Sequence, residues 1–140
     1  MVLSGDTRVS DNLIKFAKGA DLLIHEVGMS KQDPRLEGPL DERLPNGGTR
    51  RQLRKVAEHH TDPAEAGTIF EMVKPRLAMF SHYTGGVTTA GLPLVRQNYS
   101  GALEFGEDGM TIDVGETIAI HRLLVPAGDS ILRDADHLPA

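Results

Sequence analysis

The sequence predicts an α/β fold, a mixed sheet flanked by helices, because short apolar runs alternate with segments of helical periodicity. The run that ends at Gly5 and the run at residues 21–25 are typical of buried strands. Between them, residues 11–18 place apolar side chains on one helical face. Strand, helix and strand within roughly twenty-five residues form a compact βαβ unit, which indicates a layered architecture.

Capping patterns locate the helices. Ser10 can cap a helix over residues 11–18, and Gly19 can end it. The Asp62-Pro63-Ala64-Glu65 pattern begins another helix, whose apolar positions at helical spacing should face the sheet. The remaining expected elements are a helix that opens at Arg50, a strand at 76–81, a short helix at 92–97, and strands at 102–105, 109–114 and 117–121.

Composition excludes several classes of protein. With 140 residues, 39% of them hydrophobic and 25% charged, the chain fits one soluble globular domain. The net charge of −5 argues against a general binder of nucleic acid or anionic membranes. No cysteine is present, so a metal would be held by histidine and carboxylate. No apolar run is as long as a membrane span and no secretion signal begins the chain, so we expect a cytoplasmic protein.

The segment from Val27 to Thr49 is rich in glycine, proline and polar residues. A structureless connection of some twenty residues is often a functional loop. We therefore expect either a mobile wall of the active site or a plain surface excursion. The basic residues that follow, from Arg50 to Lys55, indicate a solvated helix face, with steering of phosphate or sulfate as the alternative.

Candidate chemistry lies where strands end. Asp6 follows the first strand and His82 follows the strand at 76–81, so parallel neighbouring strands would bring both to one sheet edge. Imidazole and carboxylate are suitable ligands for Zn²⁺, Fe or Mn²⁺. His60 lies just before a helix N-terminus, which favours an anionic substrate or a developing oxyanion. The alternatives are that Asp6 caps a turn, that His82 is structural and that His60 is a surface residue.

Four motifs, at residues 4–8, 20–26, 60–61 and 81–82, together resemble the second half of a metallo-β-lactamase-fold hydrolase. More narrowly, they resemble the branch that contains ribonuclease Z and its arylsulfatase-like relatives. The resemblance runs in unbroken order from Val2 to about Gly115. It implies half of an αββα sandwich and a two-metal hydrolytic centre, usually zinc.

The resemblance also implies a role for individual residues. Asp6 matches the carboxylate that bridges the two metal ions, and His82 matches a terminal histidine ligand of the second ion. His60 matches a histidine that contacts the scissile group without ligating metal. Glu26, in the His-Glu pair, would orient His60 as a partner behind the site. Hydrolysis of a phosphodiester, sulfate ester or similar ester follows as the expected reaction, with a metal-activated water as nucleophile.

One family signature is absent from these residues. The His-x-His-x-Asp-His run that supplies most ligands and the general base does not occur in the sequence. A catalytic zinc is usually held by three protein ligands, and only two are predicted here. We therefore expect that metal occupancy is doubtful and that the chain is inactive on its own. A missing N-terminal half or another chain would complete the site. We expect a small ester substrate and consider nucleic acid unlikely.

The alternative is a non-catalytic assembly module. Its open half-sheet would pair with another chain, most simply in a homo-oligomer, because an unpaired sheet edge and half a core demand a partner. The apolar face expected to be buried there consists of Leu3, Leu23, Ile24, Leu77 and Met79. The expected domain covers residues 1–125, and the polar tail at 126–140 is given no function.

Overall fold

The computed structural model describes residues 1–83 and 90–122. The polar tail that the sequence predicts at 126–140 lies outside these residues. The chain divides into two compact units, Met1–Gly106 and Glu107–Ala140, and each is described here by itself. The predicted domain boundary at residue 125 falls outside the described residues as well.

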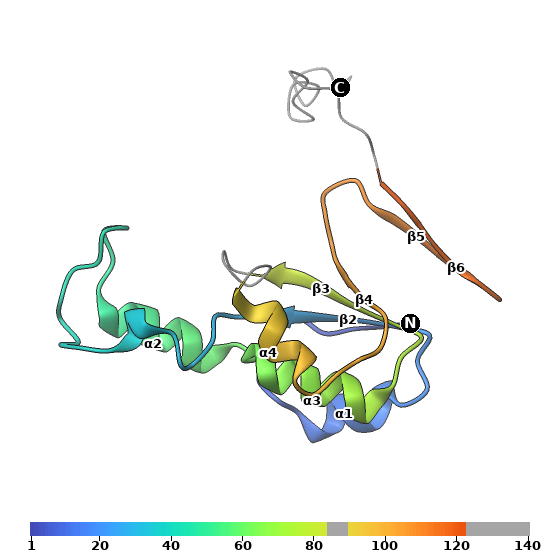
Figure 1. Ribbon diagram of the computed structural model, residues 1–140, viewed down its shortest axis with the longest axis horizontal. Coiled ribbons are helices and arrows are strands. Elements are labelled where there is room, and N and C mark those ends of the chain that lie inside the picture. The colour runs from blue at the N-terminus through green and yellow to red at the C-terminus, as the bar shows by residue number, and fades with distance from the viewer. Residues whose placement is uncertain (84–89, 123–140) are drawn as a thin grey trace, which may run out of the picture. The chain divides into compact units, whose positions relative to one another are not determined.

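The first unit is built on a four-stranded parallel sheet with the order β1-β2-β3-β4 (Figure 1). The strands are β1 (Val2–Leu3), β2 (Leu22–Val27), β3 (Leu77–Tyr83) and β4 (Leu103–Phe105). β2 lies between β1 and β3, so the strands that precede Asp6 and contain His82 are parallel but are not direct neighbours. Their carboxyl ends still lie at the same edge of the sheet.

Helices α1 (Asp11–Ala17), α3 (Pro63–Val73) and α4 (Leu92–Arg96) lie together on one side of this sheet (Figure 1). The predicted caps are present, since Ser10 accepts from the backbone N–H of Leu13 and Asp62 forms a capping box with Glu65. The core between helices and sheet contains the predicted apolar positions of α3 together with strand residues. Its members include Ile14, Ala17, Leu23, Val27, Ala66, Ile69, Phe70, Val73, Ala78, Phe80, Val95 and Tyr99.

The apolar face predicted for an assembly partner is only partly correct. Leu23 packs in the core beneath the helices, because successive side chains of a strand point to opposite faces. Leu3 is 66% exposed and Ile24 is half-buried, whereas Leu77 and Met79 are buried. The five residues therefore do not form one open apolar surface.

The segment between β2 and α2 (Arg50–His59) contains a short 3₁₀ helix, η1 (Pro34–Leu36). The prediction of a solvated basic face is wrong for Arg50, which is buried. Its guanidinium donates to the carbonyl oxygens of Arg35 (3.0 Å) and Pro39 (3.2 Å) and pairs with Glu42. These contacts satisfy carbonyl groups that a loop would otherwise leave unpaired, so Arg50 holds the loop against the helix.

The second unit contains an antiparallel hairpin of β5 (Thr111–Val114) and β6 (Ile118–His121). These strands fall within the segments 109–114 and 117–121 that the sequence predicts as strands. Among the described residues, no helix is both long enough and apolar enough to cross a membrane.

Candidate metal centre

The structure brings Asp6, His60 and His82 together at the carboxyl edge of the parallel sheet. Each offers one ligand atom, and these atoms lie within 4.8 Å of one another. His82 Nε2 lies 3.2 Å from Asp6 Oδ1, and the His60 and His82 rings stack with centroids 5.7 Å apart. The side chains of Asp6 and His82 are about 60% exposed. The site is therefore open on one side, where solvent or a substrate can reach it.

A β-bulge in β3 orients the side chain of His82. Phe80 pairs with His25 and Tyr83 pairs with Val27, so two residues of β3, Ser81 and His82, lie opposite the single residue Glu26 of β2. His82 has a φ of 52°, in the left-handed region that residues other than glycine seldom adopt. Bulges interrupt strict side-chain alternation and redirect a side chain, frequently beside active sites. The sequence placed His82 after the strand, but the strand continues to Tyr83 and the bulge sets the direction of the imidazole.

The Glu26 carboxylate lies next to Nδ1 of His60, and its role in orienting His60 stays a prediction. This carboxylate is 1% exposed and accepts from His60 Nδ1 at 2.8 Å and from the backbone N–H of Thr61 at 2.6 Å. An ionised carboxylate can only accept, so the proton of this hydrogen bond belongs to Nδ1 of the imidazole. The second ring nitrogen, Nε2, remains available for a metal or a substrate.

Gly28 makes room for His60, a role that sequence reasoning missed. A Cβ at this position would lie 2.5 Å from the Cβ of His60, and the Gly28 N–H donates to the carbonyl oxygen of Thr61 at 2.9 Å. The only signal in the sequence was a glycine two residues after the His-Glu pair. Glycine permits close approach of two backbones, so β2 and the α2–α3 connection can meet here.

His25 is fully buried and contacts Ser4, the residue that follows β1. Its Nδ1 and the Ser4 Oγ form a hydrogen bond, and its ring packs edge-on against Phe70. Burial lowers the pKa of His25 from 6.5 to about 4, because the apolar surroundings disfavour the charged imidazolium. Its Nε2 has no hydrogen-bond partner among the described residues. His25 is therefore a neutral core residue near neutral pH.

The donor set fits a metal ion such as zinc. It combines one carboxylate with two imidazoles and no thiolate, which suits borderline divalent ions. The Nδ1–H of His60 donates to the Glu26 carboxylate, an arrangement in which carboxylates orient imidazole rings at metal sites. The roles of Asp6, His82, His60 and Glu26 as ligands or catalysts stay predictions.

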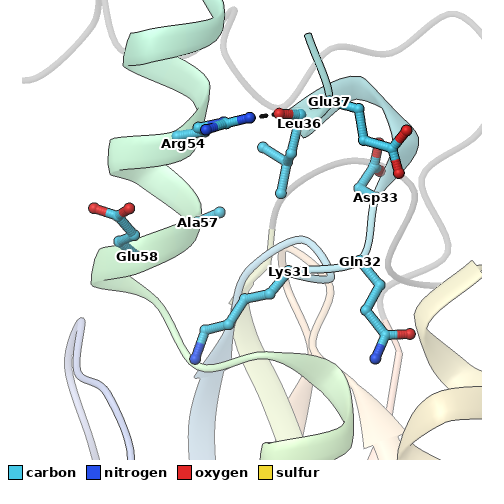
Figure 2. A pocket seen from close by; sticks show the side chains of 8 residues that line it. All are labelled: Lys31, Gln32, Asp33, Leu36, Glu37, Arg54, Ala57 and Glu58. Atoms are coloured by element: carbon cyan, nitrogen blue, oxygen red, sulfur yellow. Dashed lines mark hydrogen bonds between the residues drawn. The ribbon is translucent and has the colours of Figure 1, made fainter. Parts of the chain in front are cut away.

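The loop that follows β2 encloses a separate cavity. A space of about 340 Å³ lies between the segment around η1 and helix α2 (Figure 2). Arg54 closes one side by donating to the carbonyl oxygen of Leu36 at 2.7 Å. The lining contains none of the predicted site residues; it consists of Lys31, Gln32, Asp33, Leu36, Glu37, Arg54, Ala57 and Glu58. Among the described residues, the loop therefore shapes a pocket of its own rather than a wall of the predicted site.

Comparison with known proteins gives the following similarities. No family model matches the chain. Ribonuclease Z of Myxococcus xanthus is 29% identical over 117 residues, which cover 81% of this chain and 32% of that protein. Ribonuclease Z of Limosilactobacillus fermentum is 53% identical over 36 residues, which cover 26% of this chain and 12% of that protein. The chain thus spans a third or less of the curated relatives that it matches.

A solved structure supports the fold. The metallo-β-lactamase fold protein YhfI of Bacillus subtilis superimposes with a TM-score of 0.55 and 19% identity, over 85% of this chain and 39% of that one. This likeness and the parallel sheet with its flanking helices confirm the predicted fold class. The chain is a partial metallo-β-lactamase fold, ribonuclease Z-like in sequence.

Proposed function

We propose that this chain contributes part of the active site of a metal-dependent hydrolase that cleaves a phosphodiester. The observation that carries the proposal is the convergence of Asp6, His60 and His82 at one sheet edge, with the buried Glu26 bonded to His60. These residues lie far apart in the sequence, and no requirement of the core brings three polar side chains together there. Two of them are largely exposed, so folding stability does not explain the cluster.

Asp6 and His82 would hold the metal, Asp6 through its carboxylate oxygens and His82 through its imidazole. Zinc is the ion we propose first, with manganese or iron as alternatives. A bound ion would supply a water nucleophile at neutral pH and offset negative charge on the attacked ester. The exposure of both side chains leaves room for further ligands and for substrate.

His60 would act as the general acid. The Nδ1–H of His60 donates to Glu26, so Nε2 is the ring nitrogen left to carry the proton that would be transferred. From Nε2 the proton would pass to the departing oxygen of the ester. The backbone N–H of Thr61, the residue after His60, donates to the same Glu26 carboxylate. This bond restrains both Glu26 and His60, so the proton transfer would need little reorganisation.

The curated relatives bear on the substrate. Both are named ribonuclease Z, which weighs against our sequence-based view that nucleic acid is an unlikely partner. We therefore propose a phosphodiester, with RNA as the class to test alongside small aryl phosphodiesters and sulfate esters. The net charge of −5 argues only against general nucleic-acid binding, so an RNA substrate would be held by a locally basic surface.

Other residues must complete the site. The sequence contains no His-x-His-x-Asp-His run, so we propose that the chain alone is inactive and is completed by an N-terminal half or by another chain, most simply in an oligomer. We further propose a cytoplasmic location.

The second candidate function is a non-catalytic module that pairs through its sheet, and the 66% exposure of Leu3 on the edge strand favours it.

Metal binding by the 140-residue chain distinguishes the two functions. We would strip the chain with chelator, reload it with zinc, manganese or iron, and measure metal content, comparing Asp6→Asn and His82→Gln with the exposed controls Asp41→Asn and His121→Gln. The chain supplies only part of a ligand set, so we expect weak metal binding by the parent, binding at least tenfold weaker in both site variants, and controls that match the parent. Equal binding by all five proteins would overturn the metal-site assignment and favour the module.

Hydrolysis then tests the substrate class. The same preparations would be assayed with bis-p-nitrophenyl phosphate, p-nitrophenyl sulfate and a structured RNA. We expect no turnover by the chain alone and metal-dependent phosphodiester cleavage once the missing ligands are supplied. Cleavage of the sulfate ester alone would refute the phosphodiester proposal.

A further inference from the structure

Two consecutive residues of β2, His25 and Glu26, connect the segments that carry Asp6 and His60. Their links involve residues beside the site rather than the predicted ligands themselves. The first link is the hydrogen bond between His25 Nδ1 and Ser4 Oγ, two residues before Asp6. The second is the Glu26 carboxylate, which accepts from the backbone N–H of Thr61, directly after His60.

A third link closes these two into a ring. The Thr61 hydroxyl donates to the carbonyl oxygen of Thr7, at a distance of 2.7 Å. The chain from Ser4 to Thr7 contains Asp6, so the Asp6 turn is held at both ends. We call the closed path Ser4–His25–Glu26–Thr61–Thr7 the hydrogen-bond circuit.

The Asp6 turn has few other restraints. β1 contains two residues, and its last ladder bond to β2 runs from the Ser4 N–H to the Ile24 carbonyl oxygen at 3.0 Å. Regular structure resumes only at α1, and the Asp6 side chain is 61% exposed. By contrast, the members on the other side of the circuit are fixed, since His25, Glu26 and Thr61 are buried.

We propose that the hydrogen-bond circuit positions Asp6 relative to His60, with Ser4, His25 and Thr61 as its positioning residues. The metal-related part of this inference rests on the proposed function, whereas the mechanical coupling of the two segments does not. A ring of links restrains its members only while it is closed. Opening it at Ser4 or at Thr61 therefore releases the same constraint.

Amide hydrogen exchange in the metal-free chain tests the coupling. The variants are Ser4→Ala and Thr61→Val, and the controls are Ser30→Ala and Thr68→Val, whose hydroxyls make only local bonds. Rates are normalised to the amide of Ala78, which bonds to Ala102 in the sheet. We expect Thr61→Val to speed exchange at the Ser4 amide, and Ser4→Ala to speed it at the Thr61 amide, each about tenfold. Thr61→Ser, which keeps the hydroxyl, should restore the parent rates.

Cobalt binding tests the consequence for the site. We expect Ser4→Ala and Thr61→Val each to weaken Co²⁺ binding about tenfold and to alter its visible spectrum, as for other residues that orient ligands. The double variant should bind about as weakly as either single variant, because the circuit is already open.

The outcomes separate this inference from the proposed function. The circuit is refuted if each variant changes amide exchange only at its own link. It is also refuted if the factor by which the double variant loses Co²⁺ affinity equals the product of the factors lost by the two single variants. If the parent chain binds no Co²⁺, the proposed metal site fails, and the exchange measurement still decides whether the circuit couples the segments.

Discussion

Acid should destabilise this protein through His25, and the effect can be calculated from its burial. Burial lowers the pKa of His25 to about 4, against 6.5 for an exposed imidazole. Between these values the unfolded chain takes up a proton that the folded chain does not, so protonation favours unfolding. The free energy of unfolding is not reduced by His25 above pH 6.5, and it falls as the pH drops from 6.5 toward 4. One pKa unit corresponds to about 1.4 kcal/mol, so the complete loss is about 3 kcal/mol, of which about 2 kcal/mol is gone at pH 5.

Urea unfolding at pH 8, 6.5 and 5 measures this loss. The informative variant is His25→Asn, which cannot titrate and whose side-chain amide can still reach Ser4. It should be less stable than the parent at pH 8, because it leaves a cavity in the core, but its stability should decline less toward pH 5. The matched control, His121→Asn, changes an exposed histidine of β6 and should keep most of the parent slope. An equal slope in the parent and His25→Asn would refute the reasoning.

Three further substitutions test the geometry of the site and the loop. Gly28→Ala places a methyl group 2.5 Å from the Cβ of His60, so we expect a loss of about 1–3 kcal/mol from overpacking and loss of the low-field NMR signal of the Nδ1 proton bound to Glu26. His82→Asn puts a residue that tolerates positive φ at the bulge, so the free energy of unfolding should rise by about 1 kcal/mol while zinc affinity falls. Arg50→Met removes a buried donor to two carbonyl groups and an ion pair, so urea unfolding should show a loss of about 2–3 kcal/mol.

Two of these changes, Gly28→Ala and Arg50→Met, have a control elsewhere in the chain. Gly115→Ala introduces a methyl group with only an ordinary contact, at 3.8 Å from the Thr117 carbonyl oxygen, and should leave the His60 signal in place. Arg51→Met removes an exposed pair with Asp41 and should cost about 0.5 kcal/mol or less. If Gly28→Ala keeps the His60 signal, if His82→Asn lowers stability, or if Arg50→Met matches Arg51→Met, the corresponding contact does not have the role assigned to it.

Local signals in the sequence determined most of the fold. Ser10, Gly19 and the Asp62-Pro63 start placed α1 and α3, because caps and helical periodicity act over a few residues and need no knowledge of distant contacts. The strand runs were found for the same reason, although β3 extends two residues beyond the predicted end. The ends of parallel strands meet at one edge, so the sequence could also anticipate that Asp6 and His82 lie near each other.

The tertiary structure decided in which direction the site side chains point and which residues remote in sequence contact them. The bulge at His82, the space that Gly28 leaves for His60, and the ring of hydrogen bonds through Ser4 and Thr61 all depend on contacts between segments remote in sequence. Arg50 looks like a surface cation in a helical pattern, and only the folded loop shows that it is buried. Sequence periodicity reports which face a side chain occupies, whereas the residues that meet it there are chosen by packing of the whole unit.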